Sequence, residues 1–222
     1  MNPYEEKYSQ LIANGAIAWA DKGYFRAKEQ QEKIFQWLDF NNYLPQPGAP
    51  ILEMGCGNGA MAAQFLAERG YSVWGVDFSE TAIRWAERRF QQAGLSAHFL
   101  VGNVCHIYQC KDSMFELVID GSCLHCLIDD DRTRFFAEAK RLLKPGGRLV
   151  ISSMCGSPRN SDDISVFDPI RHHLLKEGHP WRTLKPLPAL TNEIQEAQFN
   201  VLATKVNTNE WWDHATLVCS LK

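Results

Sequence analysis

The chain has 222 residues, of which 45% are hydrophobic and 22% are charged, a composition typical of a folded globular protein. A chain of this length buries about 70% of the surface exposed in its unfolded state, so it can fold without disulfides or metals. The formal net charge of −3 favours neither nucleic acid nor an anionic membrane as a partner.

Residues 1–10 contain two glutamates and no apolar core, so we do not predict a signal peptide. No run of residues approaches the length of about 18 apolar residues that a membrane-spanning helix requires. We therefore expect a cytoplasmic protein, either a monomer or a homodimer, whose seven cysteines are reduced thiols.

Residues 1–46 are predicted to form two helices that cover the main fold. The second starts near Tyr24, and its buried stripe is predicted to consist of Ile34, Phe35, Trp37, Leu38 and Phe40. The prolines within residues 45–50 end this helical region.

From Ile51 onward, short apolar runs alternate with amphipathic segments. Strands are predicted over residues 51–57, 71–77, 97–103, 115–122 and 148–154, and helices over 60–70, 79–94 and 129–147. The second of these helices starts at Ser79, stops at Gly94, and is predicted to bury Ala82, Ala86, Phe90 and Ala93. The alternation predicts an α/β fold with a doubly wound, mostly parallel sheet.

The alternation stops after Met154. Residues 155–190 are rich in proline, histidine and charge and have no clear period, and they are too long for a plain loop. We interpret them as an insertion that covers a site. A short helix over 191–198 and an antiparallel strand pair over 199–208 and 214–222 complete the predicted single domain.

Three glycines, Gly55, Gly57 and Gly59, lie between the first predicted strand and the following helix, in the segment ILEMGCGNGA. Glycines there permit positive φ and close approach of a ligand to the backbone, and the helix behind them offers unpaired N–H groups. The spacing also fits the dinucleotide fingerprint, so the turn by itself is compatible with nicotinamide or with another adenosine cofactor.

Two carboxylates accompany this turn. Asp77 ends the second predicted strand, where a carboxylate can accept hydrogen bonds from both ribose hydroxyls of an adenosine. The alternative is that Asp77 caps the helix that begins near Ser79. Glu53 belongs to the first strand, and because a buried acid is costly unless it is paired, it suits a ligand with a positive charge.

With these features, residues 49–222 resemble the class I S-adenosylmethionine-dependent methyltransferases. Four stretches carry the resemblance in the family's order: ILEMGCGNG, VWGVDFS, FELVIDGSCLHCL and RLLKPGGRLVIS. The turn built on residues 144–147 and the closing antiparallel strand pair are not part of the dehydrogenase pattern. The resemblance implies S-adenosylmethionine as cofactor, S-adenosylhomocysteine as product, and a Rossmann-like sheet of seven mostly parallel strands with a terminal antiparallel strand.

The resemblance also divides the chain into a helical cover (1–46), a cofactor-binding core (49–154), a substrate-side insertion (155–190) and a terminal unit (191–222). It implies that Asp77 holds the ribose and that Asn103, where the family often has aspartate, helps to read the adenine edge. The implied cofactor-binding residues are Glu53, Gly55, Cys56, Gly57, Asp77, Phe78, Asn103, Val104, Asp120 and Gly121.

Methyl transfer from a sulfonium requires an in-line nucleophile and exclusion of water, and a hydroxyl or ammonium acceptor also requires a general base. His125, which follows the fourth predicted strand, is the candidate for that base or for orienting the substrate. The alternative is that it packs in the wall of the site. His172, His173 and His179 of the insertion are predicted to be surface residues.

The C-x-x-C pair Cys123 and Cys126 raises the alternative of a zinc or redox site, with Cys105, His106 and Cys110 as further candidates. A second C-x-x-C is missing, and a free cysteine commonly behaves as a small buried hydrophobe. We therefore predict buried thiols and no metal.

The acceptor site is predicted to come from the N-terminal helices and the insertion, with Tyr8, Trp19, Tyr24, Trp181 and Arg182 as its residues. Aromatic rings can hold an amine or a ring, and an arginine can bind a carboxylate or phosphate. The modest insertion and the near-neutral charge favour a small-molecule methyl acceptor over nucleic acid. A nicotinamide-dependent oxidoreductase and a non-catalytic cofactor-fold binding protein remain as alternatives.

Overall fold

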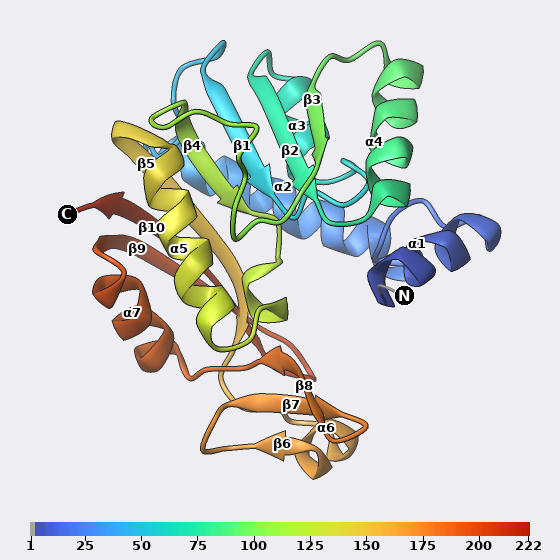
Figure 1. Ribbon diagram of the computed structural model, residues 1–222, viewed down its shortest axis with the longest axis vertical. Coiled ribbons are helices and arrows are strands. Elements are labelled where there is room, and N and C mark those ends of the chain that lie inside the picture. The colour runs from blue at the N-terminus through green and yellow to red at the C-terminus, as the bar shows by residue number, and fades with distance from the viewer. Residues whose placement is uncertain (1–2) are drawn as a thin grey trace.

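A seven-stranded sheet forms the centre of the computed structural model, which describes residues 3–222 (Figure 1). β10 pairs antiparallel with both β5 and β9, and the pairs from β3 to β5 are parallel. This arrangement confirms the predicted Rossmann-like sheet. The strands lie in the order β3 (His98–Val101), β2 (Ser72–Asp77), β1 (Pro50–Met54), β4 (Phe115–Asp120), β5 (Leu143–Cys155), β10 (Asp213–Leu221) and β9 (Phe199–Thr208).

Helices cover both faces of this sheet, as Figure 1 shows. Side chains alternate between the faces along each strand. On β1, Leu52 and Met54 therefore pack toward α5 (Asp130–Leu142) and α7 (Leu187–Glu196). Ile51 packs on the other face, toward α2 (Tyr24–Phe40), α3 (Ala62–Ala67) and α4 (Glu80–Ala93). Glu53 shares the face of Ile51 and so points toward α3.

The caps of α4 agree with the prediction. The Ser79 hydroxyl accepts a hydrogen bond from Ala82 N at 3.0 Å, and Gly94 ends the helix with a φ of +67°. The predicted buried face is correct except for Ala93, which is exposed in the last turn beside Gly94. Phe40 was also predicted to be buried, but it is the last residue of α2 and is 86% exposed.

The N-terminal helix α1 (Pro3–Ala13) lies at the carboxyl edge of the sheet, next to α4 (Figure 1). The Glu5 carboxylate of α1 accepts hydrogen bonds from Thr81 N at 3.1 Å and from the Ser79 hydroxyl. A negative charge at this place also favours the positive end of α4. A short 3-10 turn, η1 (Asp21–Gly23), joins α1 to α2. Within residues 3–222, no helix is long and apolar enough to cross a membrane.

The insertion contains regular structure that its sequence did not reveal. Beside α6 (Ser161–Ser165), a small antiparallel sheet is formed by β6 (Phe167–Asp168), β7 (His173–Lys176) and β8 (His179–Thr183). Its strands are too short for a periodic pattern to stand out. Met154, Leu174 and Leu184 form its small core, and Figure 1 shows the sheet beyond the carboxyl edge of the central sheet.

The predicted turn over residues 144–147 is part of a long β5. Gly146 has a φ of +78°, and the pairing of β5 with β4 shifts register between Phe115 and Leu117. The segment is therefore an irregular stretch of the strand, in which a glycine takes up the left-handed conformation.

Candidate active site

The glycine loop after β1 is packed so closely that side chains have no room in it. A Cβ on Gly55, whose φ is +79°, would lie 2.4 Å from Cys123 Cβ, and a Cβ on Gly57 would lie 2.7 Å from the Tyr8 hydroxyl oxygen. On the neighbouring strand, a Cβ on Gly121 would lie 2.4 Å from Gly55 O. Three predicted cofactor residues thus meet where β1 and β4 end.

Asp77 ties this loop to the next helix. Its Oδ2 accepts a hydrogen bond from Gly57 N at 2.8 Å, and its Oδ1 accepts one from Ser79 N at 2.9 Å. Ser79 itself caps α4, so Asp77 organises the turn before that helix. A carboxylate can accept about four hydrogen bonds, so capacity for a ligand remains. Phe78, the next residue, is 60% exposed.

Glu53 is a buried carboxylate beneath the loop. Its Oε2 accepts a hydrogen bond from Ala63 N in α3 at 2.8 Å, and the side chain is only 3% exposed. Burial, followed by the charges of Asp77 and Asp120, raises the pKa of Glu53 to about 8. Cys56 lies in the same region as a buried thiol, and burial raises its pKa.

Asp120, at the end of β4, organises the turn on the other side of the loop. Its Oδ1 accepts hydrogen bonds from Cys123 N at 2.8 Å and Leu124 N at 2.9 Å, and its Oδ2 accepts one from Ser152 N at 3.2 Å. Burial raises its pKa to about 6.

Glu53, Asp77 and Asp120 therefore place three carboxyl groups around the glycines. No lysine, arginine or histidine within residues 3–222 forms an ion pair with any of the three. Buried carboxylates are stabilised in their charged form by a nearby cation. The residues present thus fit a ligand that carries ammonium and sulfonium groups, as S-adenosylmethionine does.

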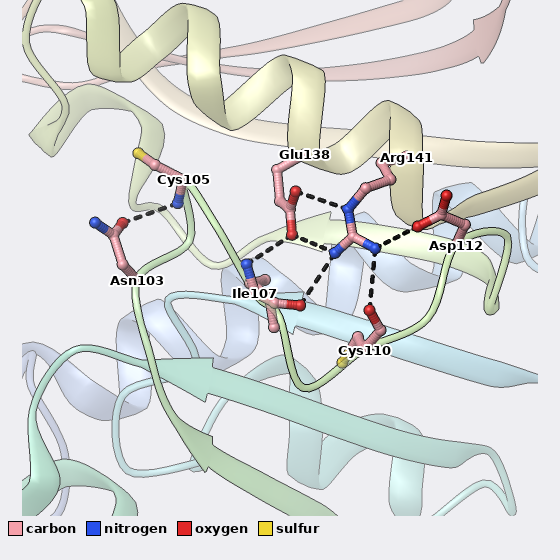
Figure 2. Close-up of polar contacts among 7 residues, drawn as sticks. All are labelled: Asn103, Cys105, Ile107, Cys110, Asp112, Glu138 and Arg141. Atoms are coloured by element: carbon pink, nitrogen blue, oxygen red, sulfur yellow. Dashed lines mark hydrogen bonds and ion pairs between the residues drawn. The ribbon is translucent and has the colours of Figure 1, made fainter.

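The loop after β3, which holds the predicted adenine-reading residues, is fixed by its own turn and by α5 (Figure 2). Asn103 Oδ1 accepts a hydrogen bond from Cys105 N at 2.9 Å, so one lone pair of the amide oxygen that was expected to meet adenine already serves the turn. Val104 is buried. Farther along, Glu138 Oε1 accepts a hydrogen bond from Ile107 N at 2.6 Å.

Arg141 completes this attachment, as Figure 2 shows. It donates hydrogen bonds to Ile107 O and Cys110 O, both at 3.0 Å, and forms an ion pair with Asp112 at 2.6 Å. A second ion pair, with Glu138, is also 2.6 Å long. The sequence interpretation did not include Glu138 and Arg141; their spacing of three on one helix is the signal that was available.

His125 lies in the 3-10 turn η2 (Leu124–Cys126) after β4 and is 8% exposed. Burial, and then the neighbouring His214 and Arg182, lower its pKa well below the usual value. Its Nδ1 is buried and has no hydrogen-bond partner in the described part of the chain. His125 is therefore a neutral imidazole with an unused polar atom.

A second imidazole, from His214 on β10, reaches the same region. Its ring centroid is 6.4 Å from that of His125, and burial lowers its pKa to about 4. Its Nε2 lies 2.9 Å from Ser152 Oγ, which lies 3.3 Å from Ser122 Oγ. The sequence interpretation missed His214 and Ser152, because only the reversed direction of β10 brings residue 214 to this edge.

The predicted acceptor residues fall into two groups. Tyr8, Trp19, Trp181 and Arg182 form a connected set through Tyr4 of α1, which receives a hydrogen bond from Arg182 Nη1 at 2.7 Å. The Tyr4 and Trp181 rings stack with centroids 5.8 Å apart, and Trp19 lies 5.9 Å from Tyr4 and 5.0 Å from Tyr8. Tyr24 instead packs in an apolar cluster with Ala18 and Ala60.

Lys176 of the insertion also lies at this set, with its Nζ 5.2 Å from the centroid of the Trp181 ring, whereas two arginines of the insertion lie elsewhere. Arg159 forms an ion pair with Asp213 at 2.8 Å. Arg171 lines a cavity of about 500 Å³ beside the start of α5. His173, predicted to be at the surface, is buried and lies 3.4 Å from Asp129, because it faces this cavity from β7.

The cysteines lie mostly in the core of the described chain. All seven are free, and none of them joins a group of histidine, cysteine, aspartate or glutamate side chains suited to a metal ion within residues 3–222. Burial raises the pKa of Cys123 well above its usual value and that of Cys105 to about 11. These thiols are therefore protonated near neutral pH.

A family model described as a methyltransferase domain matches residues 51–147. The uncharacterized methyltransferase YdaC of Bacillus subtilis is 31% identical over 141 residues, which cover 63% of this chain and 72% of that protein. Phosphoethanolamine N-methyltransferase 1 of Zea mays is 31% identical over 72% of this chain and 30% of its own length. The chain spans less than half the length of the first curated relatives that it matches.

Among solved structures, a SAM-dependent methyltransferase of Methanosarcina mazei superposes with a TM-score of 0.67 at 25% identity, over 81% of this chain and 95% of that one. The seven-stranded, mostly parallel sheet agrees with these matches. The chain therefore belongs to the class I S-adenosylmethionine-dependent methyltransferases.

Proposed function

We propose that the protein transfers a methyl group from S-adenosylmethionine to a small-molecule acceptor, with S-adenosylhomocysteine as product. The observation that carries this proposal is the set of carboxylates Glu53, Asp77 and Asp120 around a glycine loop, none of which has a cationic partner among the described residues. When bound, S-adenosylmethionine supplies a methyl group that its positive sulfonium already makes electrophilic.

The chain's own residues hold and orient that cofactor. In the proposal, Gly55, Gly57 and Gly121 let the backbone approach its methionine part, and Glu53 compensates the ammonium charge. Asp77 uses its remaining lone pairs for the ribose hydroxyls. The loop that α5 fixes receives the adenine at Asn103 and Val104, and the exposed Phe78 ring flanks it.

In the proposal, helix α1 covers the glycine loop. The Tyr8 hydroxyl reaches Gly57, and Glu5 holds α1 to the start of α4. A cover of this kind excludes water from the reacting groups, which strengthens the electrostatic interactions inside the site.

A hydroxyl or ammonium acceptor must also lose a proton, and in the proposal the neutral imidazole of His125 receives it. The unpartnered Nδ1 is one of its two ring nitrogens, and a neutral imidazole has one nitrogen that can accept a proton. A second route for the proton, in this proposal, is the chain of hydrogen bonds that links Ser122, Ser152 and His214 at the same edge.

The small size of the acceptor is part of the proposal. The insertion contributes a short helix and a small antiparallel sheet, and the whole chain has a net charge of −3. The relative from Zea mays is a phosphoethanolamine N-methyltransferase, whose name specifies a small molecule.

Calorimetry with S-adenosylhomocysteine and with NADH tests the proposal against its two alternatives. We expect the methyltransferase product to bind and NADH to give no heat. Binding of NADH alone would favour an oxidoreductase, and binding of neither would favour a protein without this cofactor. Transfer of labelled methyl to a panel of small amines, thiols, phenols and carboxylates then identifies the acceptor.

A further inference from the structure

We propose that the methyl acceptor is an anion, and that Arg182 binds its carboxylate or phosphate group. The inference rests on the proposed function and narrows the class of acceptor. Three observations support it: the partners of Arg182, its place beside η2, and the unused nitrogen of His125.

Arg182 is a partly buried arginine without a counter-ion. Its Nη1 donates to the Tyr4 hydroxyl at 2.7 Å and to Trp181 O at 2.9 Å, and its guanidinium carbon lies 3.8 Å from the centroid of the Trp181 ring. No carboxylate within residues 3–222 lies at ion-pair distance from it. By contrast, Arg132 and Arg141 each form an ion pair with a glutamate.

The contacts of Arg182 leave much of its hydrogen-bonding capacity unused. A guanidinium presents five N–H donors in a planar fork, which matches the two oxygens of a carboxylate or phosphate. Within residues 3–222, both hydrogen bonds that this side chain donates come from Nη1. Stacking on Trp181 fixes the plane of the fork, so an oxyanion can bind without further ordering of the arginine.

Arg182 also lies on the acceptor side of the cofactor residues. Strand β8 is joined to the segment after η2 by a hydrogen bond of 2.8 Å from Thr183 Oγ1 to Leu127 O. The positive charge of Arg182 is among the causes that keep His125 neutral. The charge of Arg182 therefore affects a side chain in the turn that follows Gly121, near the place where the glycine loop meets the end of β4.

The other titratable groups around Arg182 carry no compensating charge. Burial raises the pKa values of Tyr4 on α1 and Cys126 on η2, so both are protonated near neutral pH. Burial lowers the pKa values of His125 and His214, so both are neutral. Asp120, the carboxylate at the base of this turn, already accepts three backbone hydrogen bonds.

The unpartnered Nδ1 of His125 is an independent sign of a missing ligand. Buried polar atoms in folded proteins nearly always have a partner. A bound anion offers a hydrogen-bond acceptor, and its negative charge offsets the effect of Arg182 on the imidazole. An anionic acceptor would thereby raise the pKa of the histidine proposed to receive the proton.

A second basic region, beside the insertion, is the alternative binding site for an anion. A variant in this region therefore serves as the control. It is the cavity of about 500 Å³ that Arg171 lines together with Arg132 and Lys185. There, Arg132 and Lys185 already share the carboxylate of Glu193, at 2.7 and 2.9 Å. Adjacent residues of a strand point to opposite faces, so Thr183 lines this cavity while Arg182 stacks on Trp181.

The test compares Arg182→Gln, Arg182→Lys and Arg171→Gln, each saturated with S-adenosylhomocysteine. Binding of inorganic phosphate and of 4-hydroxybenzoate is followed by thermal unfolding at constant ionic strength. We expect both anions to stabilise the wild type and Arg171→Gln, and neither to stabilise Arg182→Gln. Arg182→Lys should retain part of the effect, because lysine keeps the charge but not the fork.

Matched acceptors give the second readout. 4-Hydroxybenzoate is compared with its methyl ester, and ethanolamine phosphate with ethanolamine. The wild type should prefer the charged member of each pair. In Arg182→Gln, the KM for the charged member should rise about tenfold or more, with a smaller change in kcat, while the neutral member is unaffected.

Three results would overturn the proposal. They are equal stabilisation of Arg182→Gln by the anions, loss of their effect in Arg171→Gln alone, and failure of both anions to bind the wild type while S-adenosylhomocysteine binds. Absence of S-adenosylhomocysteine binding to the wild type would instead reject the proposed function itself. Binding of that product to each variant confirms that the variant is folded.

Discussion

The proposed cofactor side and the proposed acceptor side of the carboxyl edge are built in different ways. On the cofactor side, Asp77 and Asp120 bind backbone N–H groups from nearby turns, and the glycine loop is wedged between them. On the proposed acceptor side, Arg182, His125 and Tyr4 come from separate segments, and the contact between Arg182 and Tyr4 is a hydrogen bond between side chains. The carboxylates of the proposed cofactor side bind main-chain groups, which remain when a single side chain is replaced. The proposed acceptor side depends on side chains, each of which can be replaced by one substitution.

The comparison predicts that changes on the proposed cofactor side affect folding and product binding together, whereas changes on the proposed acceptor side affect the binding or turnover of the acceptor and leave product binding unchanged. The sharpest test is Gly55→Ala. Its Cβ would lie 2.4 Å from Cys123 Cβ at a positive φ, so we expect loss of S-adenosylhomocysteine binding and a loss of stability of about 3 kcal/mol.

Gly178→Ala is the matched control for that variant. Gly178 has the same φ of +79°, but nothing lies within 4 Å of its added Cβ. The strain of the backbone alone should cost about 1 kcal/mol and leave binding intact. Chemical unfolding and calorimetry measure both quantities. Equal losses in the two variants would show that close packing is not what the loop requires.

His125→Asn tests the acceptor side. We expect product affinity to stay within about twofold of the wild type, because no described contact joins His125 to the glycine loop. Turnover of a hydroxyl or ammonium acceptor should fall about 100-fold, which is the usual effect of a general base. A thiol acceptor, which can react as its thiolate, should lose less. A parallel fall for both kinds of acceptor would assign His125 to positioning.

Asp77→Ala removes the carboxylate proposed to hold the ribose. Two charge-assisted hydrogen bonds to hydroxyls would be lost, so S-adenosylhomocysteine should bind about 100-fold more weakly. The contacts to Gly57 N and Ser79 N are lost as well, so the melting temperature should fall while the protein stays folded. Unchanged affinity in calorimetry would assign Asp77 to the turn only.

Arg141→Ala tests whether the attachment of the adenine loop to α5 matters for binding. The variant loses two hydrogen bonds to backbone carbonyls and the ion pairs to Glu138 and Asp112. We expect about tenfold weaker product binding with little change in kcat. Arg134→Ala is the control, because its ion pair with Asp131 is solvent-exposed and worth less than about 1 kcal/mol.

The pH dependence of product binding should be the smallest of these effects. Since the pKa of Glu53 is about 8 without ligand, the carboxyl is largely protonated at pH 6. The ligand's ammonium favours the carboxylate and lowers that pKa, so binding releases a proton and strengthens between pH 6 and 8, by less than tenfold per pH unit. Calorimetry in buffers of different ionisation enthalpy measures that proton, and Glu53→Gln should remove it.

The stability of the unliganded protein should change in the opposite direction. A carboxyl whose pKa is higher in the folded state binds its proton more tightly there than in the unfolded chain. Glu53 therefore makes the unliganded protein less stable as the pH rises from about 4.5 to 8, unless other groups compensate. Glu53→Gln should flatten this dependence in a series of unfolding curves.

The two sides also differ in how well the sequence predicted them. The sheet, the caps of α4 and the glycine loop follow from local signals, because Ser79, Gly94 and Gly55 act on residues next to them. The partner of Asn103 and two of the three partners of Asp120 are equally local, but a hydrogen bond to a neighbouring N–H leaves no periodic trace in the sequence.

The sequence predicted several residues of the proposed acceptor side, but it did not predict the contacts between them. Trp181 and Arg182 were expected there, but Tyr4 is 178 residues from Arg182. His214 was missed because its place depends on the direction of a single strand. Tyr24 has the same chemistry as Tyr8 and Tyr4, and only the packing of α2 on Ala60 separates it from them.

The reversed direction of β10 has a consequence for how this protein can diversify. In a parallel sheet, the carboxyl edge receives the residues that end or follow strands, and several of those positions are the ones proposed to hold the cofactor. An antiparallel strand begins at this carboxyl edge, so its first residues, here Asp213 and His214, lie there. Substitutions at the start of β10 can therefore alter the chemistry offered to an acceptor while every residue proposed to hold S-adenosylmethionine is kept.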